Sequence, residues 1–323
     1  MTTSTRDISL DAIHDAAKFV YRAAIRTPLV RVDPPGAPEG IELYLKLEML
    51  QPIGSFKIRG AVNVVRQLSR TELADGVWTV SAGNAALGVA YAARQAGVPC
   101  SVMVMDTAPA AKVDAINRLG ASIVRVTYDE AWATVERHGS SRMRGYFIHP
   151  FDDDRFIAGN ATLALEILED LPDTDSIVGS VGGGGLLSGV VSAVRPLRPA
   201  ARVYAAEPET AAPLSASLAA GQPMYFPNWR ASFVDGAGGK SVLETMWPLL
   251  RQVDGSVVVT LDEVARAIRV VAERAHVIAE GAAGCAVAAA LTGRAGSGKV
   301  VAVVSGGNID LARFFEILKS TTP

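Results

Sequence analysis

The sequence predicts an α/β fold built on open, twisted, mainly parallel sheets that are flanked by helices. Short β-branched or apolar runs recur along the chain, and most are separated by segments with an apolar spacing of about 3.6 residues. Such alternation of strands and helices is typical of parallel sheets. The chain has 323 residues, 49% of them hydrophobic, so it can bury a large core, and its length favours two domains.

The expected elements follow one another in a regular order. Strands are expected at 43–48, 77–81, 100–105, 121–126, 176–181, 202–207, 256–260 and 299–305. Helices are expected at 85–96, 110–119, 156–171 and 261–279, and Gly97 and Gly120 stand where helices commonly end. Residues 221–240 show no periodicity, and loops of this length in compact domains are often functional.

Composition and charge exclude several classes of protein. Lys and Arg number 31 against 33 Asp and Glu, without a basic block, so we expect a small-molecule partner and no nucleic acid. Cys100 and Cys285 lie in apolar surroundings, which indicates buried thiols in a reducing compartment. No apolar run reaches about 18 residues and the start lacks a signal-peptide core, so we expect a cytoplasmic protein with no membrane contact.

The stretch QPIGSFKIRGA places Lys57 at the opening of an amphipathic helix. Ser55 is the expected N-cap, and the buried stripe would comprise Ile58, Val62, Val65 and Leu68. A helix N-terminus carries positive partial charge, which should lower the pKa of an ammonium there. A lysine with a lowered pKa is a better nucleophile and proton acceptor, as Schiff-base chemistry requires. The alternative is a lysine that extends to solvent.

Four glycines, 182–185, separate an expected strand from a helix that begins near Leu186. Backbone N–H groups converge at such a helix start, so the loop predicts a phosphate site. Two alternatives remain: a loop that merely lets the helix pack closely, and a dinucleotide site in which Glu207, 22 residues beyond Gly185, binds a ribose.

Two further motifs each follow an expected strand. SAGNAALG, residues 81–88, offers a small-residue nest for a carboxylate, although Asn84 could simply cap the helix. SGGNID, residues 305–310, lies at a strand end, where ligands of parallel sheets gather. A nucleophilic lysine, a phosphate cup and an anion nest together predict pyridoxal phosphate as the cofactor.

The motifs GSFKIRGA, SAGNAALG, GGGGLLSG and SGGNID, in this order and at these spacings, resemble the serine/threonine dehydratase and serine racemase family. These are fold type II pyridoxal phosphate enzymes, similar to the tryptophan synthase β subunit in fold, and the resemblance extends over roughly residues 13–318. It implies a large cofactor domain of 1–50 and 150–323, a small inserted domain of 51–149, an active site between them, and a homodimer. The chain ends soon after SGGNID, so no regulatory domain is expected.

The resemblance also implies individual roles. Lys57 would carry the Schiff base, Phe56 would pack near the cofactor ring, Asn84 would bind the ring 3-oxygen, and Ser305 would face the ring nitrogen. The predicted cofactor-binding residues are Phe56, Lys57, Asn84, Gly182, Gly183, Gly184, Gly185, Leu186 and Ser305, and the predicted substrate-binding residues are Ser81, Ala82, Gly83, Asn84 and Ala85.

The predicted reaction is β-elimination from a β-hydroxy amino acid such as threonine, serine or a bulkier analogue, giving a 2-oxo acid and ammonia. A neutral serine beside the ring nitrogen makes the cofactor a weaker electron sink, which favours loss of a β-substituent. Ala82 replaces the serine that serves racemases of the family as second base, whereas Ala85 and Ala86 suggest a roomier site. The alternatives are a racemase, a nicotinamide-dependent oxidoreductase and a non-catalytic binder.

Other ionisable residues receive no catalytic role. Glu207 lacks acidic companions, because Ala212 and Pro213 stand where the family's cation site has acids, so no metal is expected. The four histidines lack metal-ligand spacing and are interpreted as structural or surface residues. Glu280, in AEGAAG, could either approach the cofactor or cap a helix.

Overall fold

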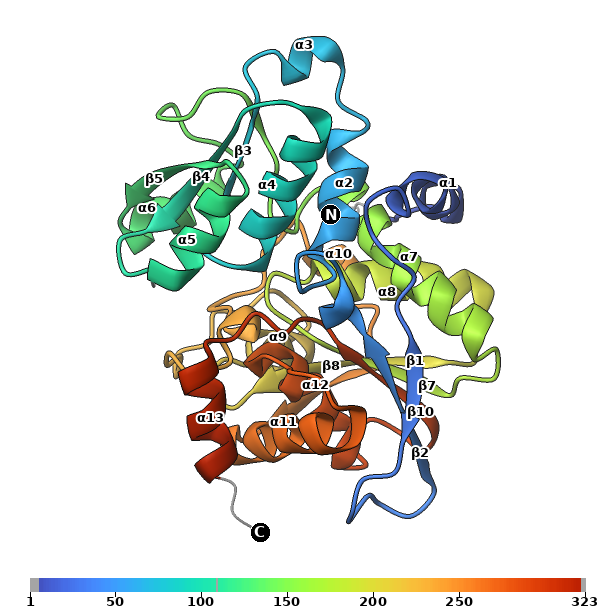
Figure 1. Ribbon diagram of the computed structural model, residues 1–323. Helices are drawn as coiled ribbons and strands as arrows, with labels where there is room; N and C mark the ends of the chain where they lie inside the picture. Colours follow the sequence, from blue (N-terminus) through green and yellow to red (C-terminus); the bar gives the residue numbers. More distant parts are fainter. Residues whose placement is uncertain (1–5, 109, 321–323) are drawn as a thin grey trace.

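Residues 6–108 and 110–320 are described by a computed structural model, in which two sheets lie one above the other (Figure 1). The larger has six strands in the order β1 (Leu29–Val32), β2 (Ile41–Leu47), β10 (Gly298–Val304), β7 (Ser176–Ser180), β8 (Arg202–Pro208) and β9 (Gly255–Val259). The smaller has four, in the order β5 (Ser122–Val126), β4 (Cys100–Met105), β3 (Val77–Val80) and β6 (Tyr146–Phe147). Only the β1–β2 pair is antiparallel among these strands, so the predicted α/β fold with two mainly parallel sheets is confirmed.

Side-chain alternation explains why helices cover both faces of the larger sheet. On β10, Val301 and Val303 pack into one core with α1 (Leu10–Val20), α7 (Asp154–Asp170), α8 (Gly185–Leu197) and α10 (Trp247–Leu250). Val300, Ala302 and Val304 face a second core with α11 (Leu261–Ala275), α12 (Gly281–Leu291) and α13 (Leu311–Ser320). The part of β10 that is buried on both faces, residues 300–304, is apolar throughout, as such burial favours.

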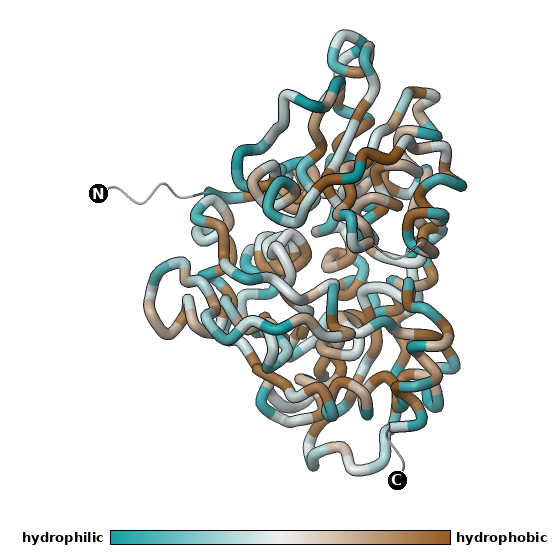
Figure 2. Tube along the Cα trace, turned by 90° about the vertical axis from the view of Figure 1, so that its left-hand side faces the viewer, coloured by the Kyte–Doolittle hydropathy of each residue, from teal (hydrophilic) through white to brown (hydrophobic). Residues whose placement is uncertain are grey.

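The smaller sheet is also covered on both faces. Val102 and Val104 share one core with α2 (Lys57–Val65), α4 (Asn84–Ala96) and α5 (Ala110–Arg118), whereas Met103 lies in the core that includes α6 (Tyr128–Glu136). Two short helices, α3 (Arg70–Leu73) and α9 (Pro213–Ala220), and two 3₁₀ turns, η1 (Glu48–Leu50) and η2 (Asp235–Ala237), complete the chain. In Figure 2, apolar and hydrophilic stretches alternate along the chain in both parts of the molecule.

Several local predictions need correction. Ser55 is not the N-cap of α2: the helix follows Phe56, which makes no side-chain cap, and Ser55 instead forms a β-bridge with Gly306. Helix α11 ends at Ala275 and does not reach residue 279, because His276 adopts a left-handed backbone with φ of 58°. In the expected stripe of α2, Ile58, Val65 and Leu68 are buried, but Val62 is only part-buried.

Residues 221–240 are almost entirely irregular, as predicted, with only η2 and a bridge between Tyr225 and Ser241. Among the described helices, of which α7 is the longest, none has the length and apolar character needed to cross a bilayer.

Candidate active site

Lys57 begins α2 and directs its amine inward. Its Nζ donates a hydrogen bond of 2.7 Å to the carbonyl oxygen of Pro150 and lies 5.2 Å and 5.3 Å from the ring centroids of Phe56 and Phe156. Burial lowers the pKa of Lys57 to about 8. The predicted direction is confirmed, and its cause is loss of solvation. The lysine does not extend to solvent.

The glycine loop joins β7 to α8 as predicted. Gly184 precedes α8 with φ of +95°, a conformation that side-chain-bearing residues rarely adopt. A Cβ on Gly183 would lie 2.2 Å from the ring of Phe151, so this glycine is required by close packing within the protein. The first N–H groups of any α-helix lack intrahelical acceptors, and here they belong to the loop and to Leu186. Residues 182–186 can therefore still hold an anion.

One turn, residues 149–152, connects the lysine to the glycine loop. Its Pro150 accepts the hydrogen bond of Lys57, and its Phe151 packs against Gly183. The buried ring of His149 shapes the turn: Nδ1 accepts the N–H of Asp152 at 2.7 Å, and Nε2 contacts the carbonyl oxygen of Val135 at 3.2 Å. Because a carbonyl can only accept, His149 is the neutral Nε2–H tautomer. Burial lowers its pKa to about 4.

His138, His149 and Asp152 also form a group whose potential metal-ligand atoms lie within 4.8 Å of one another. Both ring nitrogens of His149 already contact the backbone. The carboxylate of Asp152 accepts hydrogen bonds from Arg6, Thr245 and His138. The group is therefore a hydrogen-bond network that fixes the 149–152 turn, and its donor set does not fit a cation.

Ser305 contacts the residue before the lysine, and Asn84 is linked to the segment that follows Ser305. Ser305 is buried just after β10, and its carbonyl oxygen accepts the N–H of Phe56 at 3.1 Å. Asn84 opens α4, where it donates from Nδ2 to Glu280 at 2.6 Å and accepts at Oδ1 from Asn308 at 2.7 Å. Phe56 precedes Lys57, and Asn308 is three residues beyond Ser305, so the two motifs meet in space although they are far apart in sequence.

The 81–85 loop meets the start of α4. Ser81 Oγ accepts the N–H of Gly83 at 3.1 Å, and Gly83, not Asn84, is the N-cap, so the interpretation of Asn84 as a cap is wrong. Residues 81–84 are part-exposed and Ala85 is buried. Ala86 lies in the core between α2 and α4, so it adds no space to a substrate site.

Glu280 lies at the candidate site. The sequence left two roles open for it, approach to the cofactor or capping of a helix. It precedes α12 but makes no side-chain cap, and its buried carboxylate instead reaches Asn84. Burial, followed by the nearby charge of Asp235, raises its pKa to about 7. The signal in the sequence was an acidic residue next to small residues, which is too common to identify a site.

Glu207 has a different role from the one that the dinucleotide interpretation requires. It is fully buried and accepts hydrogen bonds from the N–H groups of Leu214 and Ser215, at 2.8 Å and 2.7 Å, and from Ser256 Oγ at 2.6 Å. These donors hold it at the N-terminus of α9. Burial raises its pKa to about 7. The carboxylate is therefore not available to a ribose hydroxyl. Glu207 accordingly gives no support to the dinucleotide interpretation.

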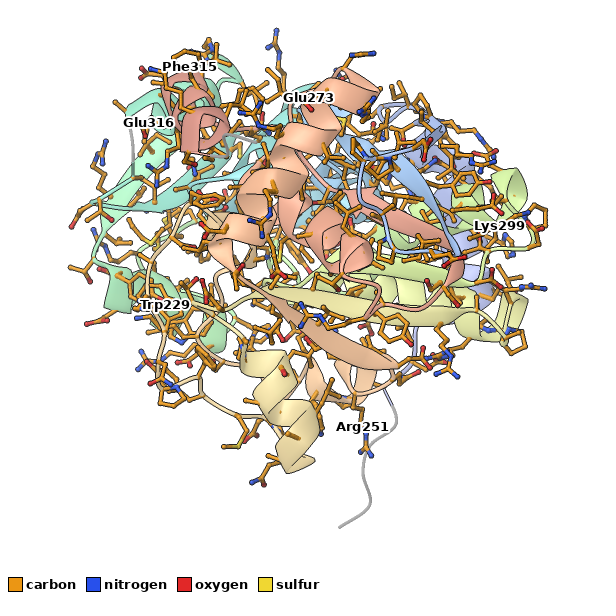
Figure 3. The ribbon with its side chains drawn as sticks, turned by 90° about the horizontal axis from the view of Figure 1, so that it is seen from below. Trp229, Arg251, Glu273, Lys299, Phe315 and Glu316 are labelled. Atoms are coloured by element: carbon orange, nitrogen blue, oxygen red, sulfur yellow. The ribbon has the colours of Figure 1, made fainter. Side chains whose placement is uncertain are left out.

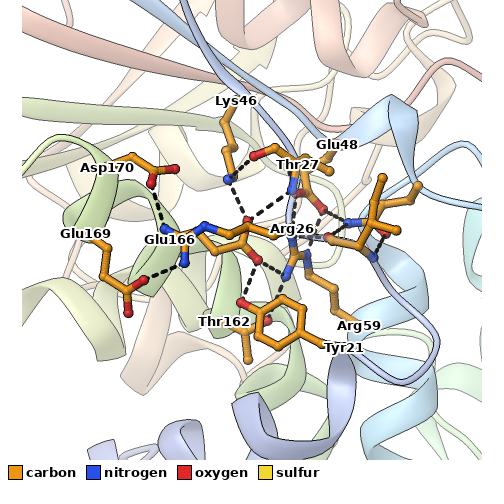
Figure 4. A network of polar contacts seen from close by, with 12 residues as sticks. Tyr21, Arg26, Thr27, Lys46, Glu48, Arg59, Thr162, Glu166, Glu169 and Asp170 are labelled. Atoms are coloured by element: carbon orange, nitrogen blue, oxygen red, sulfur yellow. Dashed lines mark hydrogen bonds and ion pairs between the residues drawn. The ribbon is translucent and has the colours of Figure 1, made fainter.

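A fully buried ion cluster anchors α2 two residues after Lys57 (Figure 4). Arg59 donates to both carboxylate oxygens of Glu48 at 2.8 Å and to Glu166 at 2.6 Å. Lys46 pairs with Glu166 at 2.5 Å. Because two residues span about 200° of a helix, Arg59 fixes the face of α2 opposite Lys57. The cluster is neutral overall and ties α2 to β2, η1 and α7.

The irregular 221–240 segment contacts helices of the smaller sheet at two points. Asp235 forms an ion pair with Lys112 of α5. The amine of Lys240 lies 4.2 Å from the ring centroid of Tyr128 on α6 and 4.4 Å from that of Trp229, which Figure 3 labels. Next to these contacts a cavity of about 40 Å³ is lined by Trp132, Phe151, Gly182, Gly183, Gly239, Ser241, Val242, Leu243 and Leu250.

Comparison with known proteins identifies relatives over almost the whole chain. Residues 20–306 match the family model described as pyridoxal-phosphate dependent enzyme. The chain is 39% identical over 308 residues to an L-threonine ammonia-lyase of Thermotoga maritima, covering 94% of this chain and 76% of that protein. It is 35% identical to a serine racemase of Dictyostelium discoideum, covering 96% of this chain and 98% of that one.

Solved structures agree. Maize serine racemase superposes with a TM-score of 0.87 at 31% identity, covering 98% of both chains. The processed form of threonine deaminase isoform 2 from Solanum lycopersicum superposes with a TM-score of 0.83 at 30% identity, covering 98% of this chain and 95% of that one.

Proposed function

The chain belongs to the pyridoxal-phosphate dependent enzyme family, with fold type II architecture, and from this premise we propose that it catalyses β-elimination from a β-hydroxy amino acid. It depends on pyridoxal phosphate, and its relatives are threonine ammonia-lyases and serine racemases. The products of the proposed reaction are a 2-oxo acid and ammonia. Supporting observations come from the chemistry of Lys57, Ser305 and Ala82.

The residues fit this cofactor. A part-buried amine with a pKa of about 8 is available at Lys57, and N–H groups able to bind an anion lie at the start of α8. The turn that accepts the hydrogen bond of Lys57 also packs against the glycine loop. We assign Lys57 as the point of attachment, residues 182–186 as the phosphate site, and residues 81–85 as the site of the substrate carboxylate. Asn84 would bind the ring oxygen, and Phe56 would pack near the ring.

When bound, the cofactor supplies the electron sink that acidifies the α-proton of the amino acid. Lys57 is the base that accepts this proton, because its lowered pKa leaves a larger fraction of the amine neutral near pH 8. Ser305 places a neutral hydroxyl at the end of β10, and a neutral partner for the ring nitrogen favours loss of a β-substituent over a long-lived carbanion. The neutral hydroxyl of Ser305 is the single observation on which we base elimination as the main activity.

Racemisation is the competing activity, because serine racemases are among the relatives. A racemase needs a second proton donor on the opposite face of the substrate. Ala82, in the part-exposed 81–84 loop, has a methyl group that cannot donate or accept a proton. On this ground we propose elimination as the main activity.

We also propose two domains with the active site between them, one of residues 1–50 and 150–323 and one of residues 51–149. The two sheets support this division, and the Asn84–Glu280 and Lys112–Asp235 contacts would join the domains at the site. A homodimer in the cytoplasm stays a prediction. Sedimentation velocity of the holoenzyme tests the dimer.

One experiment separates the candidate activities. Purified holoenzyme would be incubated with L- and D-serine, L-threonine, 3-hydroxyaspartate and phenylserine, followed by parallel assays of 2-oxo acid, ammonia and enantiomer. We expect equal amounts of 2-oxo acid and ammonia from at least one substrate. Interconversion of enantiomers without keto acid would reject elimination. Lys57→Ala should lose the borohydride-reducible visible absorption of the cofactor and lower kcat by at least ~10²-fold.

A further inference from the structure

The amide of Asn84 is held from two sides, and the chain of hydrogen bonds fixes which way it points. Asn308 Nδ2 donates to the carbonyl oxygen of Ile53 at 2.8 Å and to Asn84 Oδ1 at 2.7 Å. Because a backbone carbonyl can only accept, the nitrogen of Asn308 must face Ile53, and the oxygen of Asn84 must face Asn308. The nitrogen of Asn84 consequently faces Glu280.

The carboxylate of Glu280 is placed to accept from Asn84, and it also interacts with the backbone N–H of Asn308. Its residue is 5% exposed, it precedes α12 without capping it, and its Oε1 accepts from Asn84 Nδ2 at 2.6 Å. The backbone is shaped around the pair: a Cβ on Gly306 would lie 2.6 Å from Oε1 of Glu280 and 3.1 Å from Nδ2 of Asn84. Gly306 directly follows Ser305, so the pair lies beside the residue assigned to the ring nitrogen.

We propose that Glu280 is a positioning residue of the active site, whose carboxylate orients the amide of Asn84 so that its second N–H is left for the ring oxygen of the cofactor. This inference rests on the proposed function, which assigns Asn84 to that oxygen. An amide nitrogen has two N–H donors, and Glu280 takes one of them. Without an acceptor at residue 280, the amide of Asn84 would be held only through Asn308.

The positioning contact depends on pH. The charged groups that face Glu280 are Asp235 of η2, which raises its pKa, and Lys112 of α5, which lowers it. The amide of Asn84 on α4 and the backbone N–H of Asn308 also lower it, but burial dominates and the pKa is about 7. The ionised carboxylate makes the stronger, charge-assisted hydrogen bond to Asn84. Positioning should therefore strengthen as pH rises through 7.

Two substitutions separate shape from charge. Glu280→Gln keeps the side-chain shape and an acceptor oxygen but has no charge, whereas Glu280→Leu removes the acceptor. Glu273→Gln is the matched control, because Glu273 is an exposed acid on α11 that pairs with Arg269 away from the site (Figure 3). The dissociation constant of pyridoxal phosphate would be measured for all four proteins from pH 6 to 8.5. Thermal unfolding and 2-oxo acid production would be measured on the same preparations.

The ratio of each variant's dissociation constant to that of the wild type is the decisive quantity, because titration of Lys57 and of the cofactor cancels in it. For Glu280→Gln we expect a ratio near one at pH 6 and about fivefold at pH 8.5, and for Glu280→Leu at least about tenfold throughout. Glu273→Gln should stay near one. A flat ratio near one for folded Glu280→Gln overturns the inference, even if Glu280→Leu does not fold. A wild type that binds the cofactor but releases no 2-oxo acid rejects the proposed function instead.

Discussion

Lys57 and Phe151 are connected through a single intervening residue: the amine of Lys57 donates to the carbonyl oxygen of Pro150 at 2.7 Å, and the next residue, Phe151, fills the space that a side chain on Gly183 would occupy. The amine of Lys57 and the proposed phosphate site therefore share one support, the 149–152 turn. A displacement of the 149–152 turn would affect both ends of the cofactor site together.

The reactivity of Lys57 should follow its lowered pKa. In the cofactor-free protein, the neutral amine is the reactive form, and it predominates above a pKa of about 8. The rate of borohydride-trappable pyridoxal phosphate uptake should rise with pH and level off above about 8.5, measured by stopped-flow absorbance. A rate that keeps rising towards the ordinary lysine pKa of about 10.4 would contradict burial of the amine.

His149→Ala should weaken cofactor binding without touching the cofactor. The substitution leaves the N–H of Asp152 without its acceptor, which should destabilise the protein by about 1–3 kcal/mol. His149→Asn offers an oxygen near the position of Nδ1 and should recover part of the loss. Calorimetry and cofactor titration would measure both effects. His14→Ala, at an exposed position, should change neither.

The same histidine predicts acid sensitivity. Its folded-state pKa of about 4 lies below the ordinary value of about 6.5, so the unfolded chain binds more protons between these values. Stability contributed by His149 is therefore fully present above pH 6.5 and is lost as pH falls towards 4. Urea unfolding at several pH values should show the free energy of unfolding decreasing as pH falls from 6.5 to 4. His149→Asn should reduce the slope of this dependence on pH. An unchanged slope would assign the acid sensitivity to other groups.

Arg59 and Arg26 provide a paired test of buried and exposed charge, and both are labelled in Figure 4. Arg59→Met leaves the carboxylates of Glu48 and Glu166 buried with only Lys46 to balance them, so we expect a loss of about 3–5 kcal/mol in the free energy of unfolding. Arg26→Ala removes exposed pairs with Glu169 and Asp170 and should cost at most about 1 kcal/mol. Chemical denaturation of both variants measures the difference. Equal losses would mean that the buried cluster does not anchor α2.

Gly183→Ala should disturb the proposed phosphate site through packing. The new methyl group would overlap the ring of Phe151 at 2.2 Å, so either the ring or the loop must move. We expect at least about tenfold weaker cofactor binding and a destabilisation of about 1–3 kcal/mol. Gly139→Ala is the matched control, because nothing lies within 4 Å of the added methyl group and its φ is not positive. Similar behaviour of the two variants would contradict the close contact.

Ala82→Ser tests why elimination should dominate. A hydroxyl at this position would supply a proton-transferring group on the opposite face of the substrate, where Ala82 has none. The ratio of racemisation to elimination should therefore rise by at least about tenfold. Chiral chromatography of recovered serine, combined with keto acid assay, measures the ratio. Ala85→Ser, three residues further along but buried, should not raise it.

Sequence alone determined the fold class, because strands buried on both faces are mainly apolar, and their alternation with amphipathic helices is typical of parallel sheets. It also identified the lysine and glycine motifs, whose chemistry depends on residue type and on position at a helix start. The loop at 221–240 was recognisable by its lack of periodicity. These properties depend on local sequence, so one segment of the chain is enough to recognise each of them.

Only the tertiary structure decided how distant groups act on one another. The pKa of Lys57 follows from burial against Pro150, Phe56 and Phe156, and the orientation of Asn84 follows from Glu280 and Asn308. Desolvation and hydrogen-bond direction arise from segments up to hundreds of residues apart, so no local pattern encodes them. For the same reason Ser55, a good N-cap by type, is instead paired with Gly306. Glu207, to which the dinucleotide alternative assigned a ribose, instead accepts hydrogen bonds at the N-terminus of α9.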